Sequence, residues 1–217
     1  MMEKKEETLF ERAELEEKSY YCRPMQVTDF GIIECVHWKS ADHVQEYLEK
    51  QNIASMLAFD GPRYLGQLYL QEYDPQFSEQ GGWTGDRPWA DFQTAEPLGL
   101  EGRFLTLGCY HIGRLPNGKQ IPSLWGRGIG KALLKAVIKW YQSQQEIDGL
   151  VSWGLVSGSK KLLQWAGQMP YTIYRKFGFR EIKRVRDPRL EQDLADIDTT
   201  SAKEDIATLR VMLLTRE

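Results

Sequence analysis

WGRGIGKALLKAVIKWY, residues 125–141, joins a glycine-rich turn to the clearest amphipathic helix of the sequence. Its apolar residues recur at helical spacing on one face, while Lys131, Lys135 and Lys139 repeat every fourth residue on another. The spacing predicts a helix over about 128–144 with one buried side.

The glycines of this turn are suited to binding an anion. Gly126, Gly128 and Gly130 allow positive φ and leave room for a ligand close to the backbone. The first N–H groups of a helix point to one spot and its dipole adds positive potential, so the turn favours phosphate or pyrophosphate, helped by Arg127 and Lys131. A Walker A loop and a G-x-G-x-x-G dinucleotide fingerprint do not fit its spacing. A turn that only begins a helix remains the alternative.

The composition is that of one globular domain. The 217 residues are 41% apolar and 27% charged, and 28 Lys and Arg against 31 Asp and Glu give a net charge of −3, so the whole protein is not a polycation built for nucleic acid. Residues 103–186 hold 15 bases and 3 acids, whereas 1–18, 71–102 and 187–205 are acidic. This segregation favours an anionic ligand on the basic part and a cationic one near the acidic segments, with surface salt bridges as the alternative.

Several kinds of site and location are excluded. The three cysteines are odd in number and lack C-x-x-C spacing, and the three histidines lack H-x-x-x-H spacing, so we expect no disulfide framework and no metal. No apolar stretch reaches the roughly 18 residues of a membrane span, and the first residues lack the apolar core of a signal peptide. We therefore expect a cytoplasmic protein with no membrane partner.

Strands and helices are mixed without regular βαβ alternation. We expect strands at 19–25, 53–59, 64–73, 104–112, 149–156, 179–185 and 207–214, and helices near 29–38, 41–51, 128–144, 159–166 and 170–178. This order predicts an α+β domain around one largely antiparallel sheet. Residues 1–18 are expected to form a polar tail or arm, and 19–217 one domain with insertions at about 74–102 and 187–205.

GRGIGKALLKAVIKWY, residues 126–141, resembles the pyrophosphate-binding loop and following helix of the GNAT superfamily of acyl-CoA-dependent N-acetyltransferases. YRKFGF, residues 174–179, is similar to the late Y-x-K-x-G-F helix end of that family, and residues 23–25 with Asp29 resemble its opening strand-to-helix turn. The three occur in family order over roughly 20–217. The resemblance implies a GNAT-like fold, with a central, mostly antiparallel twisted sheet, helices on both faces, and splayed fourth and fifth strands.

The sequence also departs from the family pattern. The usual Q/R-x-x-G-x-G/A places Trp125 where Gln or Arg is common, and Arg127 is offset by two, so the resemblance implies a backbone cradle more than a side-chain role there. Gly167 stands where an Asn is common, and SGSKKLLQWA, residues 157–166, looks like an insertion before it. Contacts to a pantetheine arm from this region are therefore expected to differ from those of the family.

The resemblance implies acetyl-CoA as co-substrate and no covalent enzyme intermediate. The acetyl group would pass to a primary amine by direct attack on the thioester, with the pantetheine between the strands at 104–112 and 149–156. The cofactor-binding candidates are Ile112, Trp125, Gly126, Arg127, Gly128, Ile129, Gly130 and Lys131.

Two residues are the catalytic candidates. Tyr174 matches the family position that often donates to the leaving thiolate, with core packing as the alternative. Histidine has an unperturbed pKa of about 6.5, so His111 could act as the base, with a buried structural role as the alternative. Glu101 and Asp91 are further base candidates if the long insertion folds over the site, and Cys109 is expected to be a core residue rather than a nucleophile.

The acceptor is expected to be a cationic amine, either a small molecule or a peptide amine. The two insertions are acidic and the first carries five aromatic residues, which suits a cation through charge pairing and cation–π contact. A solvated loop or a homodimer contact is the alternative. Two other functions remain open: a CoA-sensing domain without turnover, and a module that binds polyanions. No nucleic-acid motif is visible, so no nucleic-acid partner is expected.

Overall fold

The computed structural model describes residues 20–33, 38, 40–73, 98–114, 119–156, 158–159, 162–163, 166–186 and 202–216. The predicted N-terminal tail and most of both predicted insertions lie outside these residues. The proposed domain boundaries therefore stay predictions.

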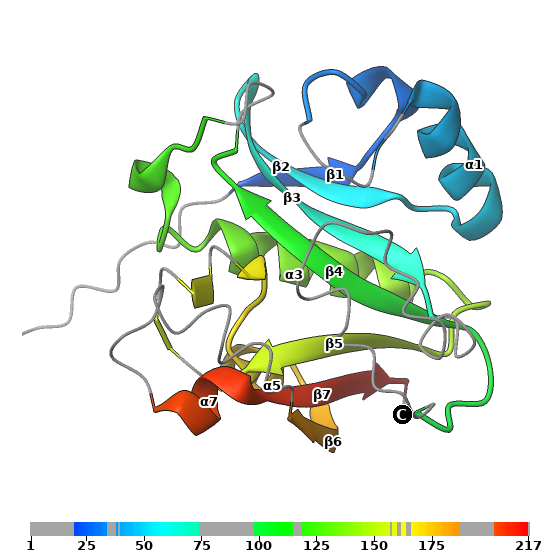
Figure 1. Cartoon of the computed structure of the whole chain (residues 1–217). Helices are drawn as coiled ribbons and strands as arrows, with labels where there is room; N and C mark the ends of the chain where they lie inside the picture. Colours follow the sequence, from blue (N-terminus) through cyan, green and yellow to red (C-terminus); the bar gives the residue numbers. More distant parts are fainter. Residues whose placement is uncertain are drawn as a thin grey trace, which may run out of the picture.

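A seven-stranded mixed sheet, in the order β1-β2-β3-β4-β5-β7-β6, forms the centre of the described chain (Figure 1). Its strands are β1 (Tyr21–Pro24), β2 (Ser55–Asp60), β3 (Arg63–Glu72), β4 (Phe104–Ile112), β5 (Gly149–Leu155), β6 (Arg180–Arg186) and β7 (Thr208–Thr215). Every neighbouring pair is antiparallel except β4 and β5, which are parallel. The expected α+β class and largely antiparallel sheet are confirmed.

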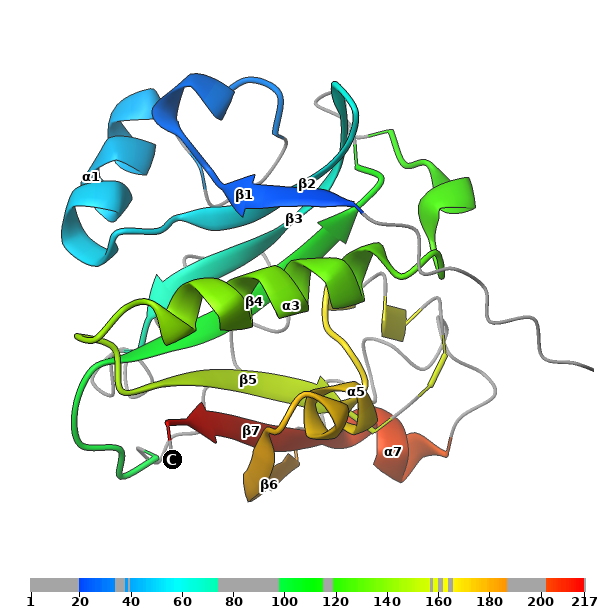
Figure 2. The ribbon, with the colours of Figure 1, turned by 180° about the vertical axis from the view of Figure 1, so that it is seen from behind.

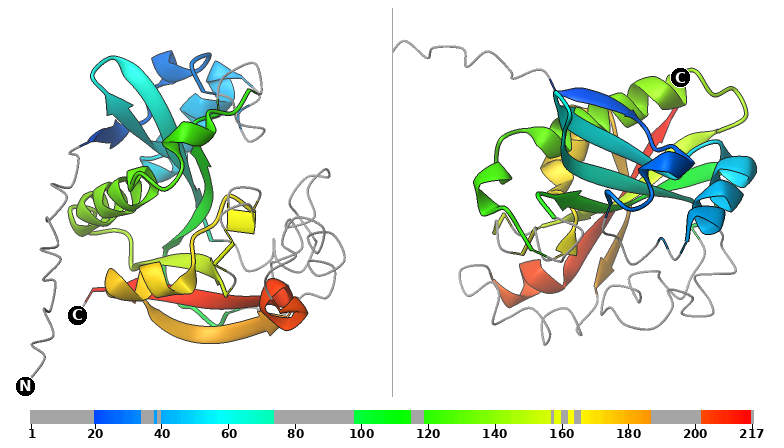
Figure 3. Two further views of the ribbon diagram at one scale, coloured as in Figure 1. Left: turned by 90° about the vertical axis from the view of Figure 1, so that its left-hand side faces the viewer. Right: turned by 90° about the horizontal axis from the view of Figure 1, so that it is seen from above.

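Helices cover both faces of this sheet, as expected (Figure 3, left). The helices described are α1 (Ala41–Gln51), α3 (Ile129–Gln142), α5 (Tyr171–Lys176) and α7 (Lys203–Ala207), with short 3₁₀ turns at Val27–Asp29 and Pro122–Leu124. Helices α3 and α5 lie on one face (Figure 2), and α1 packs on the other.

The helix predicted near 29–38 is wrong over the part that the structure describes. A 3₁₀ turn ends at Asp29, and Phe30–Ile32 form a turn instead of a helix. Gly31 has a φ of 107°, which is incompatible with a right-handed helix. Residues 34–37 lie outside the description.

The amphipathic pattern of α3 is confirmed. Its apolar stripe is buried against β4 and neighbouring strands, while Lys131, Lys135 and Lys139 are exposed. Burying each large apolar side chain contributes about 1.5–3 kcal/mol, so this stripe holds the glycine-rich turn against the sheet.

Strands β4 and β5 splay apart, as the resemblance implies. Residues 104–107 of β4 pair with residues 149–152 of β5, and beyond these residues both strands continue without pairing to each other. The β3–β4 register shifts near Gly108 and Cys109, where β4 has one residue more than β3. Such a bulge bends a strand, and this one lies where the pairing of β4 with β5 ends.

Candidate functional site

The turn before α3 has the backbone shape that binds anions. Gly126 and Gly128 have φ values of 77° and 83°, in the region that favours glycine, and Gly128 is the N-cap of α3. A Cβ on Gly128 would meet no atom within 4 Å, so there is free space beside this residue. Because Ala132 N–H makes the first α-helical bond, to Gly128 C=O, the N–H groups of 129–131 have no acceptor within the helix.

Two side chains outside the turn fix its position. The Trp125 indole Nε1–H donates to the Ile112 carbonyl at 3.2 Å, which ties the turn to the end of β4. The Tyr20 hydroxyl donates to the Arg127 carbonyl at 3.1 Å. Arg127 and Lys131 are exposed beside the helix start, and no acidic residue lies in its first turn. The structure therefore brings all eight cofactor-binding candidates together, with Trp125 as a positioning group.

The gap between the splayed strands is bridged by residues 167–170. Tyr110 N–H donates to the Gly167 carbonyl at 2.7 Å, and Leu155 N–H donates to the Met169 carbonyl at 3.0 Å. The Gln168 side-chain amide donates to the Gly108 carbonyl at 3.0 Å. The chain itself thus bridges the gap between β4 and β5, where the resemblance places the pantetheine.

Tyr174, the predicted acid, is fully buried on α5. Its hydroxyl lies 3.5 Å from the Tyr110 hydroxyl, and its ring packs edge-on against Phe179. Burial raises the pKa of Tyr174 to about 12, although the nearby Ser152 and Tyr110 hydroxyls and the Met169 backbone oppose the rise. Burial raises the pKa of Tyr110 as well. Both phenols are therefore protonated at neutral pH.

His111, the predicted base, is 7% exposed and lies opposite Gln67 of β3. Successive side chains of a strand point to opposite faces, and Tyr110 packs with α3 and Tyr174. His111 is therefore on the other face of the sheet from Tyr174.

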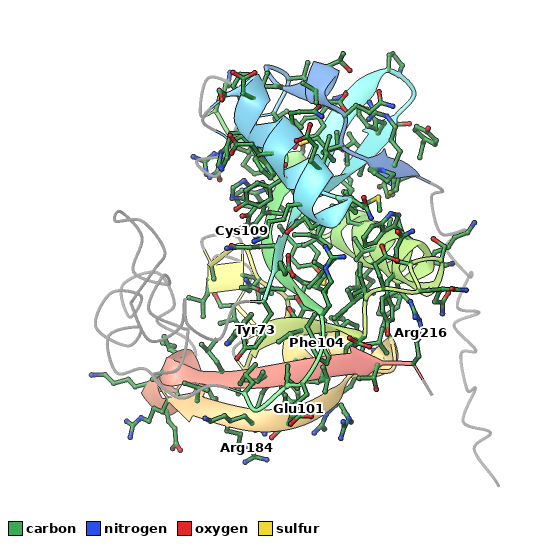
Figure 4. All side chains as sticks on the ribbon, turned by 90° about the vertical axis from the view of Figure 1, so that its right-hand side faces the viewer. Tyr73, Glu101, Phe104, Cys109, Arg184 and Arg216 are labelled. Carbon is green, nitrogen blue, oxygen red and sulfur yellow. The ribbon has the colours of Figure 1, made fainter. Side chains whose placement is uncertain are left out.

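Glu101, one of the two further base candidates, is not brought to the site. Figure 4 shows Glu101 far from Cys109, because Glu101 precedes the start of β4 whereas the site lies at its end. Asp91 lies outside the described residues. Cys109 is buried, as expected of a core residue.

Sequence reasoning missed Tyr110 and Tyr20, and it singled out Gly167 without predicting the hydrogen bonds of residues 167–170. Tyr110 packs between the Gly130 position and Tyr174, because a Cβ on Gly130 would lie 3.7 Å from its ring. The β4 bulge shifts the alternation of faces, so a period of two does not show which way Tyr110 points. No local sequence pattern predicts the long-range bonds of Tyr20 and of residues 167–170.

Among the described residues, no group of His, Cys, Asp and Glu could hold a metal ion. A search for membrane-crossing helices in the same part of the chain finds none with the required length and apolar character.

No protein-family model matches the sequence, and no curated protein matches it significantly. The structure resembles that of the mosquito arylalkylamine N-acetyltransferase-like 5b, with a TM-score of 0.53 over 91% of this chain and 100% of that chain, at 14% identity. The chain has the fold of the GNAT superfamily.

Two further GNAT structures with lower scores are similar over most of this chain. Arabidopsis thaliana NAA60 in complex with acetyl-CoA has a TM-score of 0.47 at 12% identity, covering 91% of this chain and 100% of that one. A Bacillus subtilis acetyltransferase in complex with CoA has a TM-score of 0.47 at 16% identity, covering 92% and 100%.

Proposed function

We propose that this protein is an N-acetyltransferase that moves an acetyl group from acetyl-CoA to a primary amine. The observation that carries the proposal is the left-handed Gly126–Gly128 turn at the start of α3, beside splayed strands of a GNAT fold. This helix start offers N–H groups and positive dipole potential at one point, with free space beside Gly128. We place the pyrophosphate of acetyl-CoA there, with Arg127 and Lys131 supplying charge.

In the proposed reaction the amine nitrogen attacks the thioester carbon, the C–N bond forms, and the C–S bond breaks. An alkyl amine with a pKa of about 10.4 is protonated at pH 7 and must first lose a proton. We assign that proton to His111, directly or through water. The thiolate leaves with the electron pair of the C–S bond and is protonated afterwards.

Tyr174 is proposed to donate a hydrogen bond to the departing sulfur. A phenol with a pKa of about 12 holds its proton at neutral pH, and full transfer to a thiolate whose acid has a pKa of about 8.5 is uphill. Its proposed role is therefore to stabilise developing charge. Because His111 and Tyr174 lie on opposite faces of the sheet, the amine would approach from one face and the sulfur would leave toward the other.

The experiment is a free-thiol release assay with acetyl-CoA across a panel of amines. Gly128→Glu should abolish cofactor binding, since it places negative charge where the pyrophosphate would lie. Gly128→Asn is the matched control, because Asn tolerates positive φ and adds no charge. Equal CoA affinity in both variants would contradict the proposed cradle.

Tyr174→Phe tests the proposed hydrogen bond to sulfur. We expect kcat to fall by about tenfold to a thousandfold, as for loss of one charge-stabilising donor, with CoA affinity nearly unchanged. An unaltered kcat would remove Tyr174 from the mechanism.

A second candidate is a CoA-binding domain without turnover. The complete burial of Tyr174 and the bridged gap favour it, because neither leaves a reacting group exposed to a thioester. CoA binding without thiol release across the amine panel would select this candidate.

A further inference from the structure

Residues 167–170 form a short bridge, hereafter the strap, between β4 and the end of β5. Its contacts replace a strand-to-strand ladder: Tyr110 N–H to the Gly167 carbonyl on one side and Leu155 N–H to the Met169 carbonyl on the other. The Gln168 side chain adds a bond to the Gly108 carbonyl. The strap therefore uses polar groups of β4 that the splay would otherwise leave open.

The strap also contacts both ends of the proposed active site. The Met169 side chain packs on Gly130 in the first turn of α3, close enough to occupy the place of a Cβ there. The Met169 backbone also hydrogen-bonds with the Tyr174 hydroxyl, which lowers the pKa of Tyr174. One segment thus lies between the proposed pyrophosphate cradle and the proposed hydrogen-bond donor.

We propose that the strap is a built-in competitor of the cofactor: it occupies the pantetheine channel in the resting protein, and acetyl-CoA binding displaces it and uncovers Tyr174. This inference rests on the proposed function. Because α5, which carries Tyr174, follows the strap directly, displacement of the strap by the cofactor also moves α5 and exposes Tyr174.

Two of the three hydrogen bonds that the strap makes to the strands have a counterpart on the cofactor. Pantetheine carries two amides, each with one donor and one acceptor, and these match the Tyr110 N–H and the Gly108 carbonyl that the strap now uses. Since only the Leu155 N–H loses its partner, the free energy of displacement is smaller than that of breaking all three bonds outright. The resting strap then weakens the apparent affinity for CoA without preventing binding.

A disulfide that locks the strap tests this directly. A Cβ on Gly167 would lie 3.3 Å from the Cys109 Cβ, close to disulfide geometry, and Cys109 is not in a disulfide. We would make Gly167→Cys in a background where Cys22 and Cys35 are serine, and verify the bond by mass spectrometry. Gly167→Ala in the same background is the control, because it carries the same backbone strain at a φ of 59° without a thiol.

The expected result is that the oxidised variant binds CoA at least tenfold more weakly than the same protein after reduction, by calorimetry. The Gly167→Ala control should bind equally with and without reductant. Equal affinity of the locked and reduced forms would overturn the strap proposal and leave the proposed function standing. If the wild-type and reduced proteins bind no CoA, the proposed function fails, and the strap proposal fails with it.

A second pair of measurements does not depend on forming the disulfide. Gln168→Ala removes the bond to the Gly108 carbonyl, so CoA should bind about twofold to tenfold more tightly. In the wild-type protein, added CoA should raise hydrogen exchange at the Leu155 amide, which loses its bond to Met169. Unchanged or weaker affinity in Gln168→Ala, together with unchanged exchange at Leu155, would overturn the proposal.

Discussion

Two buried glutamines differ in whether their side-chain amides have hydrogen-bond partners. Gln67 is fully buried, and both of its side-chain polar atoms have no hydrogen-bond partner. Gln51 is 1% exposed, but it donates to the carbonyls of Ile53 and Leu70 and accepts from Glu72 N–H. Burial without partners costs free energy, whereas burial with partners does not.

We predict that Gln67→Leu raises the free energy of unfolding by about 1–3 kcal/mol, because it removes a desolvated amide without leaving a broken bond. Gln51→Leu is the matched control. It should lower the free energy of unfolding by a similar amount, because it leaves the carbonyls of Ile53 and Leu70 and the Glu72 N–H without their hydrogen-bond partner. Urea unfolding of both variants checks this. A loss of stability in Gln67→Leu as large as that in Gln51→Leu would contradict it.

Asp29 connects the first strand to the turn that follows it. Burial alone would raise the pKa of Asp29, but hydrogen bonds from the Arg23 guanidinium and Gln26 N–H, with the Arg23 charge, hold it below its usual value. A carboxylate with a lowered folded pKa contributes stability above its unfolded pKa of about 3.9 and loses it as pH falls through the folded value.

The expected result for Asp29→Asn is a loss of about 1.5–3 kcal/mol at pH 7, with a smaller difference from wild type below pH 4. Chemical denaturation of wild type and variant between pH 2.5 and 7 measures the loss at each pH. This range spans the unfolded pKa of about 3.9. If the difference in the free energy of unfolding between wild type and Asp29→Asn stays constant across this range, the charge of Asp29 is not what stabilises the fold.

At this scale the sequence was informative only where a residue type allows few conformations. Gly126 and Gly128 adopt the positive φ that their pattern predicts. Tyr110 could not be assigned a face, because a one-residue bulge reverses the alternation.

At the scale of elements, β5 packs closely against the start of α5. A Cβ on Gly154 would lie 2.5 Å from the Tyr171 Cα and 2.6 Å from its Cβ, at the start of the helix that carries Tyr174. Only glycine fits where two backbones approach this closely.

We predict that Gly154→Ala lowers the free energy of unfolding by about 1–3 kcal/mol, because α5 must move away from β5. Gly158→Ala is the control, since its Cβ would meet no atom within 4 Å, and it should change stability by less than about 0.5 kcal/mol. Thermal unfolding compares them. Equal thermal midpoints for Gly154→Ala and Gly158→Ala would show that the close packing of β5 on α5 does not contribute to stability.

Long periodic elements were predictable and irregular ones were not. Helix α3 and strand β4 lie where apolar spacing places them, because burial of one face fixes both. The expected 29–38 helix failed at Gly31, whose positive φ has no local signal. The strap could not be foreseen, because its bonds join residues far apart in the chain.

For the whole molecule, the separation of charge along the chain bears on the acceptor. Residues 103–186 carry 15 bases and 3 acids, and this part contains the proposed cofactor cradle. The acidic segments at 71–102 and 187–205 are proposed to attract a cationic amine, although most of both lies outside the described residues.

If the acceptor is a cation attracted by these acids, its KM should rise severalfold between about 20 mM and 300 mM salt, because the Debye length shortens from above 10 Å to below 8 Å. A neutral amine acceptor provides the comparison and should show little change. Steady-state kinetics at constant pH measures both. An acceptor KM that is insensitive to salt would contradict charge pairing as the basis of recognition.

The most direct test of the account is the structure of a crystal soaked with CoA. The account predicts the CoA pyrophosphate within hydrogen-bond distance of the backbone N–H groups of Ile129, Gly130 and Lys131, with the strap displaced from its bond to Leu155. A pyrophosphate bound elsewhere on the protein, or no bound CoA at a saturating concentration, would contradict it.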